Sequence, residues 1–396
     1  MIRKPIRKPI RKPVRKPLRN NFVKSEKSFN FKIINISLFI IRVLLGCVFI
    51  FSGFVKAIDP LGFTYKIDDY LRSFGGFFES LSVVAFPASI ALSTLELLIG
   101  LNLIFKIQLK RTGFLALLFM LVMTPLTLYI ALYNPVSDCG CFGDALVISN
   151  WATFYKNLVL ILMVVIILFN YHNLESKIQP RLQWIIAGLF VFFGIGISIY
   201  SFRHLPLIDF MPYKIGVNIP AAMVIPENAL SDKYETTFIY EKDGLKKEFT
   251  LENYPKGDST WKFVDQKSVL LVKGYTPPIH DFSIVNSQYE DITNQILSDS
   301  LQTYLLIMYD LTQTNDEGAK LVESKYQKAL KSGIQFYALT GSSDEEVEKF
   351  KLKNKVTFPF CKTDPITLKT IIRANPGLVL IKKGTVVGKW NWRDIE

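Results

Sequence analysis

The sequence predicts an α-helical membrane bundle followed by a smaller α/β domain outside the membrane. Three observations predict this fold class. The 396-residue chain is 49% hydrophobic and contains 31 Phe, which is high for a soluble protein. Five apolar stretches each reach about 20 residues, the length that crosses the hydrocarbon core of a bilayer. From about residue 214, short apolar runs alternate with polar helical segments, as in a soluble α/β domain.

The N-terminal residues 1–32 are expected to form a disordered basic tail. A four-residue repeat, R-K-P-[IVL], runs from Arg3 to Leu18. Its prolines exclude a helix and give no donor to a sheet, so the repeat should be extended and solvated. The tail holds +11 of the net charge of +13. No aromatic side chains interleave the repeats, so we expect contact with anionic membrane lipids and no nucleic acid.

The five predicted membrane spans follow from apolar runs that are long enough to cross the bilayer. The first run is too long for the apolar part of a cleavable signal peptide. The predicted spans are Ile33–Phe54, Leu81–Phe105, Gly113–Tyr133, Trp151–Phe169 and Trp184–Phe202.

The charges of the short loops predict the orientation, because Lys and Arg resist translocation. Loop 106–112 has three basic residues and loop 171–183 has Lys177 and Arg181, whereas loop 134–150 has two Asp and no Lys or Arg. The N-terminus and the two basic loops should therefore be cytoplasmic. Loop 134–150 and everything after the fifth span should lie on the outer side.

The outer loop contains the stretch SDCGCFGD, with two of the four cysteines of the chain. On an oxidising side of the membrane, Cys139 and Cys141 would be exposed to disulfide exchange. A Cys-x-Cys disulfide closes a small strained ring that is easily reduced, and Gly140 tolerates the positive φ that the middle position favours. The pair is the candidate catalytic site. A structural staple remains an alternative, and a metal site is disfavoured because the loop has no His.

The two other cysteines are candidate secondary thiols. Cys47 lies in the outer half of the first span and could exchange with the loop, or could simply pack. Cys361 lies in the stretch FPFCKTD of the outer domain. It could resolve a mixed disulfide, or it could be inert.

Two charges lie inside the predicted spans, where charged side chains are costly and usually paired. Arg42 and Glu96 each lie about nine residues from the inner end of their span, so both should be about 13 Å deep. We therefore expect an ion pair between them that fixes the register of the two helices. There are two alternatives. The two residues could have a role with protons or a quinone, or the Arg42 side chain could snorkel to the lipid headgroups.

The C-terminal region has the element order of a small α/β unit. Paired strands are predicted around the turn Lys383-Gly384, and Ser343 to Glu346 has the pattern of a helix start. The predicted strands are 236–240, 268–275, 303–309, 334–340, Gly377–Ile381 and Thr385–Trp390, and the predicted helices are Asp316–Ser332 and Ser343–Lys353.

The run from Arg42 to Pro60, the ELLIG patch from Glu96 to Gly100 and the CGCFGD loop together resemble DoxX-like and methylamine-utilisation MauE-like membrane proteins. The resemblance covers roughly residues 30–170. It implies a four-helix bundle in a bacterial inner membrane, associated in the MauE branch with disulfide formation in periplasmic proteins. In the DoxX branch it implies a link to quinone oxidoreductases, and on that ground alone a quinone is considered as acceptor. No other cofactor is evident.

The outer domain resembles a thioredoxin-like fold. In such folds a cis-proline precedes the last strand pair, a position that Pro376 would take. A working thioredoxin has Cys-x-x-Cys at the start of the helix after its first strand, whereas residues 310–317 contain no cysteine. The predicted domains are a tail over 1–32, a four-helix bundle over 33–170, a linker with the fifth span over 171–213, and a thioredoxin-like domain without the dithiol over 214–396.

These features predict an inner-membrane redox-associated protein, with its N-terminus in the cytoplasm and its C-terminal domain in the periplasm. Cys139 and Cys141 would support thiol–disulfide exchange or electron transfer with a periplasmic protein thiol as substrate. A non-catalytic anchor or scaffold for the assembly of periplasmic proteins is the alternative. A transporter is less favoured, because the five spans show no inverted repeat.

Overall fold

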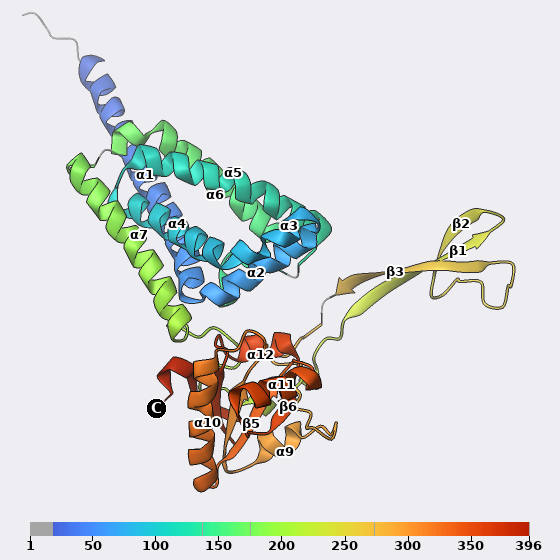
Figure 1. The fold of residues 1–396 in the computed structure, drawn as a ribbon. Coiled ribbons are helices and arrows are strands. Elements are labelled where there is room, and N and C mark those ends of the chain that lie inside the picture. The colour runs from blue at the N-terminus through green and yellow to red at the C-terminus, as the bar shows by residue number, and fades with distance from the viewer. Residues whose placement is uncertain (1–18, 137, 175, 273, 396) are drawn as a thin grey trace, which may run out of the picture. The chain divides into compact units, whose positions relative to one another are not determined.

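The computed structural model describes residues 19–136, 138–174, 176–272 and 274–395. The chain divides into two compact units, Met1–Ile199 and Tyr200–Glu396. The first unit is helical, and the second contains both sheets (Figure 1). The R-K-P repeats of the tail lie outside the described residues.

The helices of the first unit confirm the five predicted spans to within a few residues. Over the described residues, the helices long and apolar enough to cross a membrane cover Ile33–Ile58, Phe77–Phe105, Leu109–Tyr133, Asn150–Phe169 and Pro180–Arg203. The α-helices are α1 Arg19–Ile58, α2 Pro60–Phe74, α3 Phe77–Ser80, α4 Ala85–Phe105, α5 Leu109–Tyr133, α6 Asn150–Phe169 and α7 Pro180–Arg203, with 3₁₀ turns η1 Leu81–Val84, η2 Gly143–Ala145 and η3 Tyr171–Leu174.

The boundary of the tail differs from the prediction. Helix α1 begins at Arg19, so residues 19–32, expected to be disordered, are helical. The last proline of the repeats is Pro17. Beyond it nothing prevents the first span from extending as a helix towards the N-terminus.

The expected ion pair between Arg42 and Glu96 is wrong. Arg42 Nη1 donates instead to the backbone carbonyls of Leu103 and of Ile104, the latter at 2.7 Å. These carbonyls belong to the last turn of α4, where carbonyls lack partners within the helix. Glu96 pairs with Lys56, whose Nζ lies 2.7 Å from Glu96 Oε1.

The register of α1 against α4 explains this correction. The two helices are antiparallel, and a Cβ added to Gly100 would lie 2.8 Å from the carbonyl oxygen of Gly46. Four residues from this contact, Arg42 faces Ile104. Glu96 lies about 12 Å further along the helix axis, since each residue advances the helix by 1.5 Å. The two charges are therefore at different depths.

Small residues let α1 and α4 approach closely. A Cβ on Gly53 would lie 2.6 Å from the backbone nitrogen of Leu97, and a Cβ on Gly100 would lie 2.6 Å from that of Ile50. Glycine at helix contacts is a common device in membrane bundles. Large apolar side chains complete the core of the unit, among them Leu45, Phe49, Ile99, Leu103, Met120 and Val164.

The second unit contains a five-stranded mixed sheet in the order β6-β5-β4-β7-β8. Strands β4, β5 and β6 are parallel, and β7 and β8 are antiparallel to their neighbours. This is a thioredoxin-like topology. The strands are β4 Gln302–Ile307, β5 Gln335–Thr340, β6 Phe360–Lys362, β7 Gly377–Lys382 and β8 Thr385–Asn391, and the helices are α8 Ile219–Met223, α9 Thr293–Ser298, α10 Asp316–Lys331, α11 Asp344–Asn354, α12 Pro365–Ile371 and the 3₁₀ turn η4 Trp392–Asp394.

Both faces of this sheet are buried. Along β4, Leu305 and Ile307 enter one hydrophobic core while Leu306 enters the other, because successive side chains of a strand point to opposite faces. The peptide bond between Asn375 and Pro376, just before β7, is cis.

The predicted strands 236–240 and 268–275 do not join the α/β sheet. They belong to a separate antiparallel sheet with the order β2-β1-β3. Its strands are β1 Lys233–Lys242, β2 Leu245–Thr250 and β3 Lys262–Val272. The turn between β1 and β2 is formed by Asp243 and Gly244, both with positive φ, which is the usual requirement of a two-residue hairpin turn.

The close contact of α1 and α4 predicts the effect of a single added methyl group. We expect Gly100→Ala to destabilise the protein by about 1–3 kcal/mol, because the new Cβ meets backbone atoms that cannot move aside easily. Gly188→Ala in α7 is the matched control, since a Cβ there meets nothing within 4 Å. Thermal unfolding in detergent measures both. Equal stability of the two variants would contradict the close packing.

Candidate functional site

The two vicinal cysteines lie in the connection between α5 and α6. Asn150 closes the base of this loop, because its Nδ2 donates to Asn134 Oδ1 (3.1 Å) and to the carbonyl of Val136 (3.3 Å). Ser149 caps α6 by accepting a hydrogen bond from the backbone nitrogen of Ala152. The loop is thus held at both of its helix junctions.

The two sulfurs lie 3.0 Å apart, and both cysteines are unbridged. The backbone between them turns through Gly140, whose φ is +60°, a conformation that costs glycine little. Asp138 Oδ1 accepts a hydrogen bond from the Gly140 nitrogen at 2.9 Å. A short movement would therefore bring the sulfurs to the bonding distance of about 2.05 Å.

Helix α2 holds the loop from one side. Lys66 and Tyr70 are four residues apart and so share one face of this helix. Lys66 Nζ lies 2.8 Å from Asp138 Oδ2, and the Tyr70 hydroxyl donates to the carbonyl of Cys139 at 2.5 Å. Burial, with Cys139 as a further cause, raises the pKa of Tyr70, so its hydroxyl keeps the proton that it donates.

A buried ion pair between α1 and α4 lies behind the loop. Lys56 Nζ lies 2.7 and 3.0 Å from the two carboxylate oxygens of Glu96, and both side chains are 3% exposed. Ser52, one turn before Lys56, lies 2.6 Å from Glu96 Oε2 and 2.7 Å from the carbonyl oxygen of Cys141. Since a hydroxyl has one proton, Ser52 donates to one of these oxygens at a time. The ion pair and the cysteine loop thus share a hydrogen-bond donor.

The surrounding charges make the two thiols unequal. A hydrogen bond from the Cys139 thiol, aided by the positive charges of Lys156 and Lys56 and opposed by burial, lowers the pKa of Cys141 to about 6. The same hydrogen bond, together with burial, raises the pKa of Cys139. The pair therefore holds one proton on Cys139 and a thiolate on Cys141 at neutral pH. Thiolates are the nucleophilic form of cysteine.

A small cavity adjoins Cys141. It has a volume of about 30 Å³ and is lined by Ser52, Lys56, Glu96 and Lys156 among others. This volume corresponds to about one water molecule. A quinone ring does not fit in this volume, so the cavity beside Cys141 is not a quinone site. Among the described residues, no group of three or more His, Cys, Asp and Glu is placed to hold a metal ion.

The secondary thiols are not brought to this site. Cys47 is exposed on α1 and lies five residues before Ser52, about 140° around the helix. Cys361 is 3% exposed in the core of the α/β domain, and burial raises its pKa to about 11. These positions favour packing or surface roles for the two cysteines.

The segment after β4 replaces the dithiol of a working thioredoxin with a hydrogen-bonded turn. Asn375 Nδ2 donates to the carbonyl of Asp310 at 2.7 Å, and Thr314 Oγ1 lies 2.9 Å from Asn375 Oδ1. Asn315 then caps α10 by accepting from the Gly318 nitrogen. The turn beside the cis-proline Pro376 is thus polar and closed, with no thiol.

Sequence reasoning missed Lys56, Ser52, Lys66, Tyr70 and Lys156. The first span was expected to end at Phe54, which left Lys56 among the mixed charges of the following segment. A usable signal was present, because Ser52 and Lys56, like Lys66 and Tyr70, have the four-residue spacing of one helix face. Which face meets the loop depends on helix packing, which periodicity does not give.

The buried ion pair predicts strong coupling between its two residues. We expect Lys56→Met alone, or Glu96→Met alone, to cost about 3–5 kcal/mol, because each leaves an unpaired buried charge. The double variant should recover most of that loss. Lys66→Met is the control, since its pair with Asp138 is partly exposed and should be worth about 1 kcal/mol or less. Folded yield and thermal unfolding measure the effect, and additive losses in the double variant would contradict the pairing.

Comparisons with known proteins agree with these two units. Residues 34–170 match the family described as methylamine utilisation protein MauE, and residues 234–273 match a domain of unknown function (DUF8463). The second match coincides with the three-stranded sheet. No curated protein matches the chain.

Among solved structures, one similar chain is titled "Solution structure of a putative protein disulfide isomerase from Bacteroides thetaiotaomicron". The similarity has 17% sequence identity and a TM-score of 0.25, and it covers 28% of this chain and 75% of that one. The thioredoxin-like topology of the second unit is assigned from its strand order and not from this similarity. The chain therefore joins a membrane region that matches the MauE family, residues 34–170, to a C-terminal domain of thioredoxin-like topology.

Proposed function

We propose that this protein carries out thiol–disulfide exchange with a protein partner through Cys139 and Cys141. The observation that carries the proposal is the pair of sulfurs 3.0 Å apart, with the Cys141 pKa lowered to about 6. Vicinal thiols with one depressed pKa are suited to nucleophilic attack on disulfides. The MauE-family match of the membrane region supports a redox role.

The exchange begins at Cys141 in the reduced pair. Its thiolate attacks one sulfur of a disulfide in the partner, and the second sulfur of the partner leaves as a thiolate. Cys139 then attacks Cys141 Sγ and releases the first sulfur of the partner. The proton of Cys139 and the proton lost earlier by Cys141 end on the two partner thiols. The partner gains two electrons, the Cys139–Cys141 pair loses two, and the reverse sequence oxidises a dithiol partner.

Lys156 and Lys56 act as electrostatic supports in this scheme. Both are among the causes that lower the Cys141 pKa. Lys156 also lies over the ring of Phe142, with its Nζ 4.5 Å from the ring centroid. Positive charge beside Cys141 stabilises the thiolate before attack and again when Cys141 leaves a mixed disulfide.

Access to the sulfurs requires the loop to open. Cys139 is 7% and Cys141 is 8% exposed, so a partner cannot reach either sulfur fully in the closed loop. Gly140 and Gly143 both have positive φ, and such glycines give the loop two flexible points beside the thiols. The burial would restrict exchange to partners that displace the loop.

The side of the membrane follows from the charge distribution of the loops. We place the N-terminus and the basic loops in the cytoplasm of a bacterial cell, and the cysteine loop and C-terminal domain in the periplasm. An oxidising compartment would then surround the thiols. The C-terminal domain, which has no cysteine in residues 310–317 after β4, would bind the protein partner.

A scaffold function is the second candidate, and the closed turn at Asp310, Thr314 and Asn375 favours it. In that case the C-terminal domain would hold periplasmic proteins for assembly. The loop cysteines would then act as a structural staple, permanently bridged. Trapping experiments separate the two functions.

The difference between the two thiols predicts which one forms mixed disulfides. In intact cells we expect Cys139→Ser to accumulate disulfide-linked partners through Cys141, because the resolving thiol is gone. Cys141→Ser should accumulate several-fold fewer. Non-reducing gels of the full chain measure this, and Cys361→Ser serves as the control. If neither single variant traps a partner and the wild-type pair is fully oxidised, the scaffold function is correct.

The pKa of Cys141 predicts a pH profile for its alkylation. With Cys47 and Cys361 replaced by Ser, the alkylation rate of the reduced protein should fall about tenfold per pH unit below pH 6 and level off above pH 7, following the thiolate fraction. Lys156→Gln should move the midpoint to higher pH, because a charge that favours the thiolate is removed. Lys177 is not among the causes of the Cys141 shift, so Lys177→Gln should leave the midpoint unchanged. A wild-type midpoint near 9 would refute the role of these lysines.

A further inference from the structure

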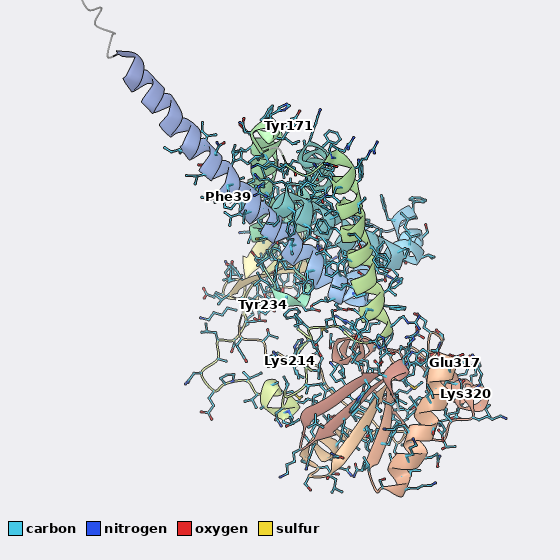
Figure 2. All side chains as sticks on the ribbon, turned by 90° about the vertical axis from the view of Figure 1, so that its left-hand side faces the viewer. Phe39, Tyr171, Lys214, Tyr234, Glu317 and Lys320 are labelled. Atoms are coloured by element: carbon cyan, nitrogen blue, oxygen red, sulfur yellow. The ribbon has the colours of Figure 1, made fainter. Side chains whose placement is uncertain are left out.

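A large cavity in the helical unit lies at the far end of α5 from the cysteine loop. Its volume is about 1000 Å³, and it is formed where the turn between α4 and α5 meets the connection between α6 and α7. Helix α5 has 25 residues, so the cavity and the loop are separated by about 37 Å along it. Figure 2 shows Tyr171, which lines the cavity, among the side chains at one end of this unit. The site is thus independent of the thiol chemistry proposed above.

Among the described residues that line this cavity, none is a carboxylate and three are cations. They are Lys106, Lys110 and Arg111. Within the described part of the chain, none of the three takes part in a salt bridge. Lys110 and Arg111 instead lie over the rings of Tyr171 and Trp184, at 5.7 and 4.9 Å from the ring centroids. An anion in the cavity would complete the charge balance.

The helix end adds to this positive potential. Gln108 precedes α5 with a φ of +48°, and its side chain does not cap the helix. The first amides of a helix lack internal partners and carry a partial positive charge. Gln183 of α7 accepts a hydrogen bond from the Gln108 nitrogen at 2.8 Å, so the fifth span is tied to the same turn.

An apolar wall continues from the charges towards the middle of the bundle. Phe114, one helical turn after Lys110, is 66% exposed, and it lines the cavity with Leu115 and Leu168. These three residues belong to the spans α5 and α6. The cavity therefore has positive charge at one end and apolar side chains along its wall. A small hydrophilic anion would contact only the charged end.

We propose that this cavity binds one anionic phospholipid. Its phosphate would lie at Lys106, Lys110 and Arg111, and an acyl chain would lie along Phe114 and Leu168. Basic pockets at the cytoplasmic ends of membrane helices suit such headgroups, and the orientation proposed above places this end at the cytoplasmic leaflet. The volume is sufficient for a headgroup and the first part of a chain.

Native mass spectrometry of the full chain in detergent tests the site. The protein is titrated with phosphatidylglycerol and with phosphatidylcholine of the same acyl chains. We expect the wild type to bind one phosphatidylglycerol more tightly than phosphatidylcholine. In K110Q/R111Q this affinity should fall about 10–30-fold, since each basic residue near an anionic headgroup contributes roughly a fivefold effect.

The matched control is K177Q/R181Q, which removes the same charge from the α6–α7 connection and the first turn of α7, outside the lining of the cavity. It should keep the affinity for phosphatidylglycerol. Phe114→Ser should weaken binding of both lipids and leave their ratio unchanged. If K177Q/R181Q loses as much affinity as K110Q/R111Q, only a general surface charge attracts the lipid. If millimolar inorganic phosphate displaces the bound lipid, the site prefers a soluble anion. Either result overturns the proposal.

Discussion

The ion pair between Lys56 and Glu96 is the constraint on which the helical unit depends. Two charges within membrane helices are tolerated when they meet each other and find further hydrogen bonds. Lys56 and Glu96 do both, through two N–O contacts and Ser52. This requirement admits one register of α1 against α4, the same one that brings Gly46 beside Gly100. In that register Ser52 faces the carbonyl of Cys141, so the pairing of two charges also positions the cysteine loop.

In this position the loop gives its two cysteine side chains, Cys139 and Cys141, different pKa values. Its backbone carbonyls are held from α1 and α2, by Ser52 and Tyr70, while the sulfurs face the cations of α1 and α6. The hydrogen bond between the two sulfurs, together with the lysine charges, favours a thiolate at Cys141 and keeps the proton on Cys139. A Cys-x-Cys sequence alone does not define a nucleophile and a resolving thiol. The lysines that contribute to the asymmetry come from helices that lie far apart in the sequence.

The sequence could predict the features that depend on residues close together in the chain. The spans depend on run length and hydropathy, and the strands around Lys383-Gly384 depend on alternation and turn residues, so these elements were identified to within a few residues. The partner of Glu96 depends on the register of two helices. A depth count from predicted span ends selected Arg42, which instead contacts the carbonyls at the end of α4. Likewise, alternation found β1 and β3 but could not assign them to a separate sheet.

The two units differ in whether they can stabilise a thiolate, and this difference bears on where thiol chemistry can occur. In a thioredoxin the helix after the first strand lowers the thiol pKa through its N-terminus. Here that helix, α10, begins with Asp316 and Glu317, whose charges oppose a thiolate at the same place. The membrane unit uses buried and half-buried lysines instead of a helix end. The charges at the start of α10 therefore favour the membrane unit over the α/β domain as the place of the proposed thiol chemistry, and in the α/β domain the cis-proline lies beside a turn with no thiol.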